Sequence, residues 1–127
     1  MDLNDYFENT KGFGVLATAN SDGAVDVAVY ARPHVLDNGT VAFIMRDRLS
    51  HENLQSNPQA AYLFREGTTG YTGKRLYLTK LREDTDPEAI AALRRRSAPT
   101  DEPDDTESRF LVTFRVDSVR PLVGDGV

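Results

Sequence analysis

The chain of 127 residues contains no cysteine and only two histidines, His34 and His51. Without cysteine it can form no disulfide, no thiolate metal site and no iron–sulfur cluster, and it has no cysteine nucleophile. Two histidines are too few for a structural zinc site built from protein ligands alone. The dipeptide His51-Glu52 is also not followed by the second histidine of the H-E-x-x-H pattern. We therefore expect no metal centre.

Long apolar segments are absent too. No eighteen apolar residues follow one another, and residues 1–6 have neither the basic nor the apolar region of a secretory signal. A cytoplasmic location is therefore expected. With 39% hydrophobic and 28% charged residues the composition is that of an ordinary globular protein, and the length suits one domain over residues 1–127.

The net charge of -5 comes from one short segment. Residues 101–107 contain five acidic residues and no basic one, and in the rest of the chain fifteen acidic residues balance fifteen basic ones. The basic residues are scattered and are not interleaved with aromatic residues on one element, so no nucleic-acid-binding surface is indicated. The prolines and acids of residues 97–108 predict a mobile loop.

The apolar pattern predicts a mainly antiparallel β protein. Alternation predicts strands over residues 12–20, 25–36, 40–45, 59–65, 71–81 and 110–116. Helical spacing predicts short helices over residues 3–11, 50–57 and 87–96. Turns at residues 21–23 and 37–39 would join the first three strands into a meander, and Pro33 predicts a bulge or a break in pairing. Six antiparallel strands without βαβ units indicate an all-β-dominated fold, α+β by count, in the form of a closed or partly closed barrel.

Two of the helices have predicted ends. For the helix over residues 50–57, Ser50 can serve as N-cap, Leu49 and Leu54 can pack as a hydrophobic staple, and Pro58 stops the helix. For the helix over residues 87–96, Asp86 can serve as N-cap. The arginines at residues 94–96 suit the negative end of the helix dipole, which is the simpler explanation of this basic run.

The best candidate for a ligand site is the junction between the third strand and the helix over residues 50–57. Arg46 and Arg48 come directly before the helix, and Ser50 adds a hydroxyl at its start. Free N–H groups at a helix N-terminus and guanidinium groups both suit an anion. The alternative is that Ser50 only caps the helix and that the arginines pair with nearby acids at the surface. The pattern alone leaves both interpretations open.

A family resemblance bears on this choice. The string Ser50-x-x-Asn53-Leu54-x-x-Asn57-Pro58, with the order of elements over residues 3–117, resembles the FMN-binding split-barrel family that includes pyridoxamine 5'-phosphate oxidase. The resemblance implies a six-stranded antiparallel split β-barrel. It also implies a homodimer that holds one FMN per subunit at the subunit interface.

The resemblance further implies where the FMN lies. The phosphate would bind in the loop between the third strand and the short helix, the ring would lie beside the second strand, and the third strand would follow the ring and the ribityl chain. The residues at these positions are Arg46, Arg48, Leu49, Ser50 and His51 in the loop, Ala28, Val29 and Tyr30 on the second strand, and Phe43, Ile44 and Met45 on the third. Many relatives have a lysine or arginine where this chain has His51, so phosphate binding would depend more on the two arginines.

The implied activity is flavin-dependent redox chemistry, as an oxidoreductase or an electron carrier. Arg32 would favour a reduced, anionic flavin. The chain lacks the longer C-terminal region with which the true oxidase completes its substrate site, so that reaction is not expected. Two alternatives remain: a split barrel that binds a deazaflavin or haem, with His34 as a haem ligand, or a dimeric binding module without a cofactor.

Overall fold

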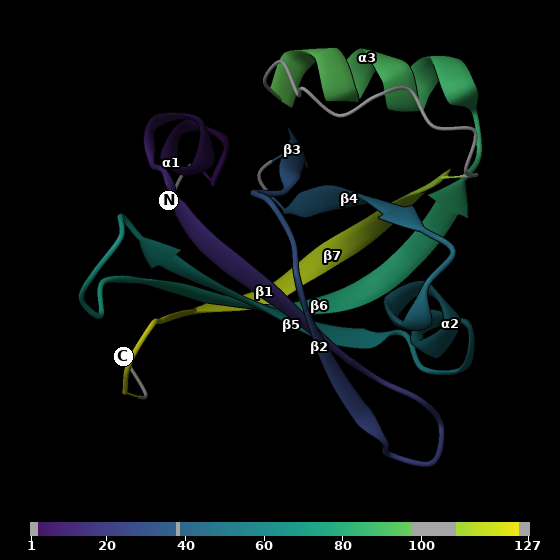
Figure 1. The fold of residues 1–127 in the computed structure, drawn as a ribbon, viewed down its shortest axis with the longest axis horizontal. Coiled ribbons are helices and arrows are strands. Elements are labelled where there is room, and N and C mark those ends of the chain that lie inside the picture. Colours follow the sequence, from purple (N-terminus) through teal and green to yellow (C-terminus); the bar gives the residue numbers. More distant parts are fainter. Residues whose placement is uncertain (1–2, 38, 98–108, 125–127) are drawn as a thin grey trace.

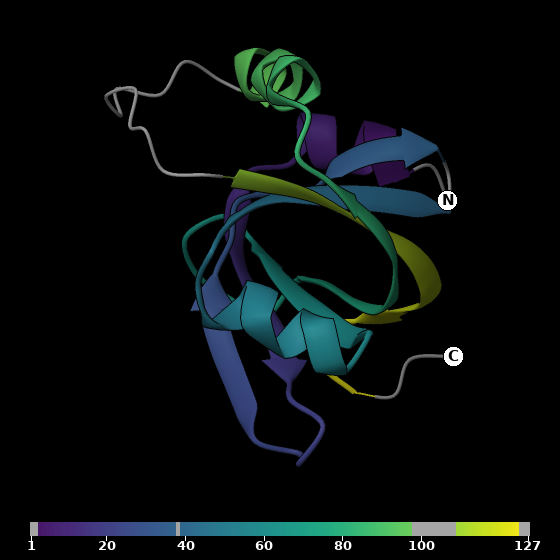
Figure 2. The ribbon, with the colours of Figure 1, turned by 90° about the vertical axis from the view of Figure 1, so that its right-hand side faces the viewer.

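The computed structural model describes residues 3–37, 39–97 and 109–124. These residues form seven strands and three helices (Figure 1). Their bounds in chain order are α1 (Leu3–Asn9), β1 (Gly12–Ala19), β2 (Val25–Val29), β3 (His34–Asp37), β4 (Thr40–Arg46), α2 (Leu49–Ser56), β5 (Gln59–Glu66), β6 (Gly73–Asp84), α3 (Pro87–Ser97) and β7 (Arg109–Pro121). All strand pairs are antiparallel, in the order β2-β1-β5-β6-β7-β4-β3. Figure 2 shows this sheet curling into a barrel, with α2 across its lower part and α1 and α3 above it in that view. The predicted β-barrel class is confirmed.

The predicted strand over residues 25–36 is wrong as a single element. It is interrupted after Val29, and β3 begins at His34 on the opposite edge of the sheet. Pro33 has no N–H for a ladder, so the chain leaves β1 here and crosses to β4. The barrel therefore has seven strands rather than six. The predicted meander is wrong too, because β2 pairs with β1 whereas β3 pairs with β4.

Residues 30–33, which connect β2 to β3 and which we call the crossing segment, are hydrogen-bonded to the barrel. The Tyr62 hydroxyl lies 3.1 Å from the carbonyl oxygens of both Tyr30 and Ala31, and Tyr30 N donates to Gly14 O at 3.1 Å. A Cβ atom on Gly14 would meet the Tyr62 hydroxyl oxygen at 1.9 Å, so only glycine leaves room for this contact. Burial raises the pKa of Tyr62, which keeps the phenol protonated as a donor.

Replacing Tyr62 with phenylalanine tests this attachment. The variant keeps the ring but leaves the two carbonyl groups without their donor, so we expect the free energy of unfolding to fall by about 1 to 2 kcal/mol. Urea unfolding followed by circular dichroism measures it. Tyr71→Phe, at a tyrosine that is largely exposed, is the matched control and should change stability by less than about 0.5 kcal/mol. Equal stability of the two variants would show that the hydroxyl does not hold the crossing segment.

The barrel interior is filled by aromatic and branched side chains. Its largest fully buried members are Tyr62, Phe43, Phe64, Phe114, Leu16, Met45, Leu76, Leu78, Val41 and Val112. Phe7 of α1 closes one end, with its ring 5.2 Å from the ring of Phe64. Leu3 and Phe7 are both buried, so the predicted N-terminal helix is confirmed as an amphipathic plug, although it ends at Asn9. A filled interior of this kind leaves ligand binding to the barrel's outer surface.

The start of α2 differs from the prediction. The N-cap residue is Arg48, with no side-chain cap bond, and Ser50 is the second residue of the helix with only 3% of its surface exposed. The Ser50 hydroxyl instead hydrogen-bonds Tyr30. Leu49 is 51% exposed, so the predicted staple is wrong as well. The predicted end is confirmed, because the helix stops at Ser56 and Pro58 follows within two residues.

The remaining boundaries are close to those predicted. β6 begins at Gly73 rather than Tyr71, and β7 continues to Pro121. Asp86 caps α3, since its Oδ1 accepts from Glu88 N at 3.0 Å. The predicted mobile loop lies, from residue 98 to residue 108, outside the described residues, as does Asn38 of the second turn. No helix in the described part has the length and apolar character needed to cross a membrane.

Candidate functional site

A groove of about 590 Å³ lies on the barrel surface between β2, the crossing segment, β4 and the start of α2, and the first residue of β7 completes it. It is lined by Asp26, Ala28, Val29, Tyr30, Ala31, Arg32, His34, Phe43, Ile44, Arg46, Arg48, Leu49, Ser50 and Arg109. This volume is within the usual range for cofactor sites.

The middle of the groove is apolar and aromatic. Ala28 and Val29 come from β2, and Phe43 and Ile44 come from β4. The Tyr30 ring packs edge-on against Phe43, with centroids 5.8 Å apart. Burial raises the pKa of Tyr30, and the Ser50 hydrogen bond offsets only part of that rise. Tyr30 therefore presents a neutral phenol beside an apolar wall.

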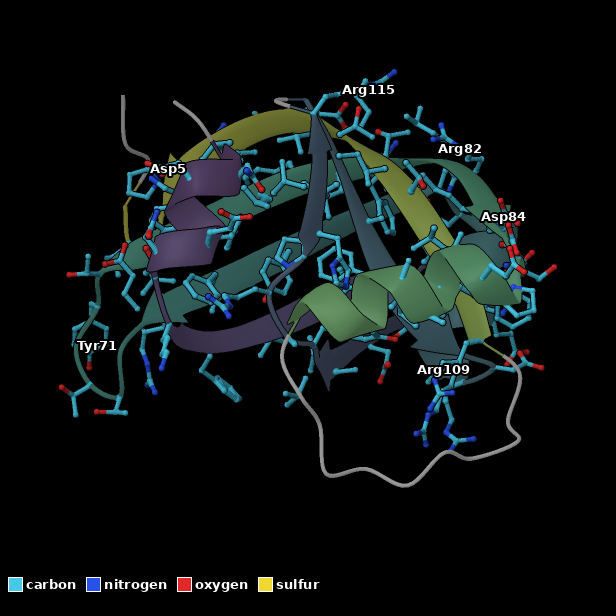
Figure 3. All side chains as sticks on the ribbon, turned by 90° about the horizontal axis from the view of Figure 1, so that it is seen from above. Asp5, Tyr71, Arg82, Asp84, Arg109 and Arg115 are labelled. Carbon is cyan, nitrogen blue, oxygen red and sulfur yellow. The ribbon has the colours of Figure 1, made fainter. Side chains whose placement is uncertain are left out.

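One end of the groove is cationic. The β4–β7 register places Arg46 directly opposite Arg109, and Arg48 follows in the turn to α2. That turn is tight, because Arg48 N donates to Arg46 O at 2.8 Å. In Figure 3 the Arg109 side chain extends outward from the barrel, beyond α3 in that view. Guanidinium groups gathered beside the N-terminus of a helix can donate to an anion, so this end suits a phosphate.

The helix α2 is fixed beside this end by buried polar contacts. Asn53 Nδ2 donates to Thr18 Oγ1 of β1 at 3.1 Å, and both side chains are buried. Leu54 is buried in the core next to them. The Asn53-Leu54 pair of the sequence string therefore anchors the helix to the barrel, and it fixes where the first turn of α2 and its free N–H groups lie.

Most of the sequence-predicted site residues lie together in this groove. Those that line it are Ala28, Val29, Tyr30, Phe43, Ile44, Arg46, Arg48, Leu49 and Ser50. Met45 does not line it, because its side chain is fully buried in the barrel core. His51 does not line it either. One residue further along α2 turns a side chain by about 100°, and the His51 ring stacks on Phe110 of β7 instead.

The groove also contains residues that the predicted site omitted. Asp26 and Arg32 share the alternation of Ala28 and Tyr30 along the predicted strand, so the period-two pattern could have found them. Arg32 is held by α1, since its Nη1 donates to Phe7 O at 2.6 Å and to Thr10 O at 3.1 Å. No local sequence pattern marks Arg109 as a site residue, because it reaches Arg46 only through the pairing of β4 with β7.

A second hollow of about 300 Å³ lies on the outer face of β1, β2, β5 and β6 and is lined by Val15, Ala17, Val27, Ala61, Tyr62, Leu63, Arg75 and Tyr77. Beside it, Val25, Val27 and Val29 of β2 are 72%, 64% and 69% exposed. We call these three residues the valine patch. Figures 1 and 2 both show the β1–β2 hairpin projecting beyond the barrel. Val29 also lines the groove, so the patch and the groove are adjacent.

Comparison with known proteins identifies the fold. No family model and no curated protein matches the chain. Solved structures do match: an FMN-binding protein from Syntrophomonas wolfei subsp. wolfei has a TM-score of 0.77 at 15% identity, covering 97% of this chain and 85% of that one. An F420 reductase has a TM-score of 0.71 at 20% identity, with coverage of 91% and 94%. A putative pyridoxamine 5'-phosphate oxidase from Lactobacillus delbrueckii has a TM-score of 0.66 at 19% identity, with coverage of 92% and 88%.

These likenesses assign the chain to the split-barrel fold. The resemblance expected from the sequence to the FMN-binding split barrels is thus confirmed for the fold. At these identities the structures show the fold, which does not by itself identify a ligand.

Proposed function

We propose that the chain binds FMN in the groove and is a flavin-dependent redox protein, either an oxidoreductase or an electron carrier. One observation carries the proposal: three arginines, Arg46, Arg48 and Arg109, meet at one end of a groove whose middle is apolar and aromatic. FMN has two ends that match these two parts of the groove: a planar ring system at one end and a phosphate at the other. Its redox chemistry would come from the bound flavin.

The chain's own groups would hold the two ends differently. The three guanidinium groups and the free N–H groups of the first turn of α2 would bind the phosphate. β2 is an edge strand, so one side of its backbone faces no neighbouring strand of the sheet. Tyr30 N donates to Gly14 O of β1, and successive N–H groups of a strand point to opposite sides, so the Val29 N–H would be available to the polar edge of the ring. Ser50 would position Tyr30 through their hydrogen bond, and Arg32 would place a fixed positive charge in the same wall.

Absorption spectroscopy tests the ligand. We expect the purified protein to carry, or to take up on addition of FMN, a chromophore with the paired absorption bands of an oxidised flavin. Release by denaturation and mass spectrometry then identifies it. A deazaflavin, which also joins a planar ring to an anionic tail, is the second candidate for the same groove. A Soret band would instead indicate haem held through His34. A protein that stays colourless and fails to bind added FMN would contradict the proposal.

We also propose that two copies of the chain associate through the valine patch and the hollow beside it. Contiguous exposed apolar surface of this kind usually marks an interaction site. Because Val29 lies in both the patch and the groove, a partner there would cover the ring end of a bound flavin. This association would give the homodimer expected from the sequence, with the flavin at the interface between its subunits.

Replacing Val27 with glutamate tests the dimer. Val27 lies at the centre of the patch and is 64% exposed, so a charge there would be buried against a partner while costing the isolated subunit little. We expect sedimentation velocity to show a dimer for the wild type and a monomer for Val27→Glu, with weaker FMN binding. Leu36→Glu is the control: this residue is 43% exposed on the opposite edge strand, and its variant should stay dimeric. A monomeric wild type would contradict the proposed association.

A further inference from the structure

His51 lies behind the groove, on the side of α2 that faces β6 and β7. It is 7% exposed, and its ring stacks on Phe110 with centroids 3.8 Å apart and planes 13° apart. Nδ1 lies 3.3 Å from Asp47 Oδ1, and Nε2 lies 3.0 Å from Glu83 Oε2. Each ring nitrogen therefore faces a carboxylate oxygen, and the stacking leaves the ring little freedom to turn away.

The hydrogens available near His51 determine how the ring can bond. Gln55 Nε2 has two hydrogens and lies 3.0 Å from His51 O and 2.9 Å from Glu83 Oε1, so both are used. Although the same nitrogen is 3.1 Å from His51 Nε2, it has no hydrogen left for it. His51 Nε2 therefore carries the hydrogen that bonds Glu83. A neutral imidazole has only one N–H, so its Nδ1 then presents a lone pair to the Asp47 carboxylate.

Protonation of Nδ1 would change the interaction with Asp47 from repulsion between a lone pair and a carboxylate to attraction. The imidazolium donates from both nitrogens, and the contact becomes a charge-assisted hydrogen bond. Among the described residues, the charged groups that face the ring are Asp47 from the turn and Glu83 from β6, and Lys80 of β6 binds the other oxygen of Glu83. Phe110, from β7, is uncharged.

Glu83 stays ionised while histidine titrates. Burial alone would raise its pKa, but hydrogen bonds from Gln55, Lys80 and His51 outweigh burial and hold the pKa at about 2. Across the pH range in which histidines change charge, the carboxylate at Nε2 is therefore constant. The state of the Asp47 contact then follows the Nδ1 proton alone.

Asp47 belongs to the turn that presents the arginines to the groove. It stands between Arg46 and Arg48. Its side chain is 71% exposed, and the contact with His51 is its link to the buried side of α2. We propose that His51 is a positioning residue for the phosphate end of the groove: protonation of its Nδ1 fastens Asp47, and with it the turn that carries Arg46 and Arg48. This inference rests on the proposed FMN function. Phosphate binding would gain a contribution from the imidazolium form that is lost when Nδ1 gives up its proton.

Paired titrations of FMN and riboflavin test the inference. Affinities of the wild type and His51→Gln are measured by calorimetry at about pH 5.5 and about pH 8, on either side of the histidine range. We expect His51→Gln to weaken FMN binding about threefold at the acidic pH, the scale of a partly exposed ion pair, and to leave it unchanged at the alkaline pH. Riboflavin, which lacks the phosphate, should bind both proteins equally. The ionisation of the FMN phosphate itself affects both proteins alike, so it cancels in the comparison.

Asp47→Asn provides a variant that cannot disturb the core, because the side chain it replaces is mostly exposed. In this background the substitution His51→Gln should have no further effect on FMN affinity at either pH, which completes a double-mutant cycle. Nitrogen NMR of the ring should show a proton on Nδ1 at the acidic pH in the wild type. An FMN loss that is equal at both pH values, or equal for riboflavin, would overturn the inference while leaving the FMN site in place. Failure of the wild type to bind FMN at either pH would overturn both.

Discussion

Replacing Arg46 with alanine is expected to weaken FMN binding by about 1.5 to 3 kcal/mol, about 10- to 150-fold, because a charge-assisted bond to the phosphate is lost. Arg109→Ala should have an effect of the same order, since Arg109 faces Arg46 across the β4–β7 pair. Riboflavin affinity should change little in either variant. Fluorescence quenching titrations with both ligands measure the two constants.

The matched control is Arg115→Ala. Arg115 lies on the same strand as Arg109, but it is bound to Asp117 at 2.7 Å and does not line the groove. Its removal takes away the same charge and should leave FMN affinity within about twofold, as expected for a surface charge beyond the reach of the ligand. If Arg46→Ala and Arg109→Ala both bind FMN as tightly as Arg115→Ala does, the phosphate is not bound at this end of the groove.

Replacing Phe43 with alanine is expected to lower the free energy of unfolding by about 3 to 5 kcal/mol. The ring is 2% exposed and contacts the rings of Tyr30, Tyr62 and Phe114, with centroids 5.8, 5.0 and 5.9 Å away. The substitution would leave a cavity where the barrel core meets the groove. Because Phe43 supports the Tyr30 ring, FMN affinity should fall as well.

Phe43→Leu separates packing volume from ring contacts. It restores most of the volume, so we expect it to cost less than about 1.5 kcal/mol. Thermal and denaturant unfolding of the wild type and the two variants give the comparison. A loss of under 1 kcal/mol for Phe43→Ala would show that the ring is not packed between Tyr30 and the core, contrary to its burial and its three ring contacts.

The sequence predicts local structure well where the causes are local. Pro58 ends α2, Asp86 caps α3, and the turn at residues 21–23 is closed by Gly23 in a left-handed conformation, with φ at 85°. Each of these depends on the conformational limits of one residue and its immediate neighbours. Ala28 and Tyr30 entered the candidate site through the family resemblance, and the alternation along the strand places both on the same face.

The errors come from contacts between distant parts of the chain. Serine is a residue type that favours the N-cap position, but the Ser50 hydroxyl bonds the side chain of Tyr30, which lies twenty residues earlier in the sequence. Pro33 indicated a break without showing that the chain would cross to the other edge of the sheet. Arg109 enters the site only through its register with Arg46. His51 is adjacent to Ser50 in sequence, but its side chain is turned about 100° around α2 and stacks on Phe110.

A crystal structure of the protein with FMN tests the central proposal most directly. We expect the phosphate to contact the guanidinium groups of Arg46 and Arg109 beside the first turn of α2, with the ring along Ala28 and Val29. Flavin bound elsewhere, or this end of the groove filled by protein atoms of an associated subunit, would contradict it.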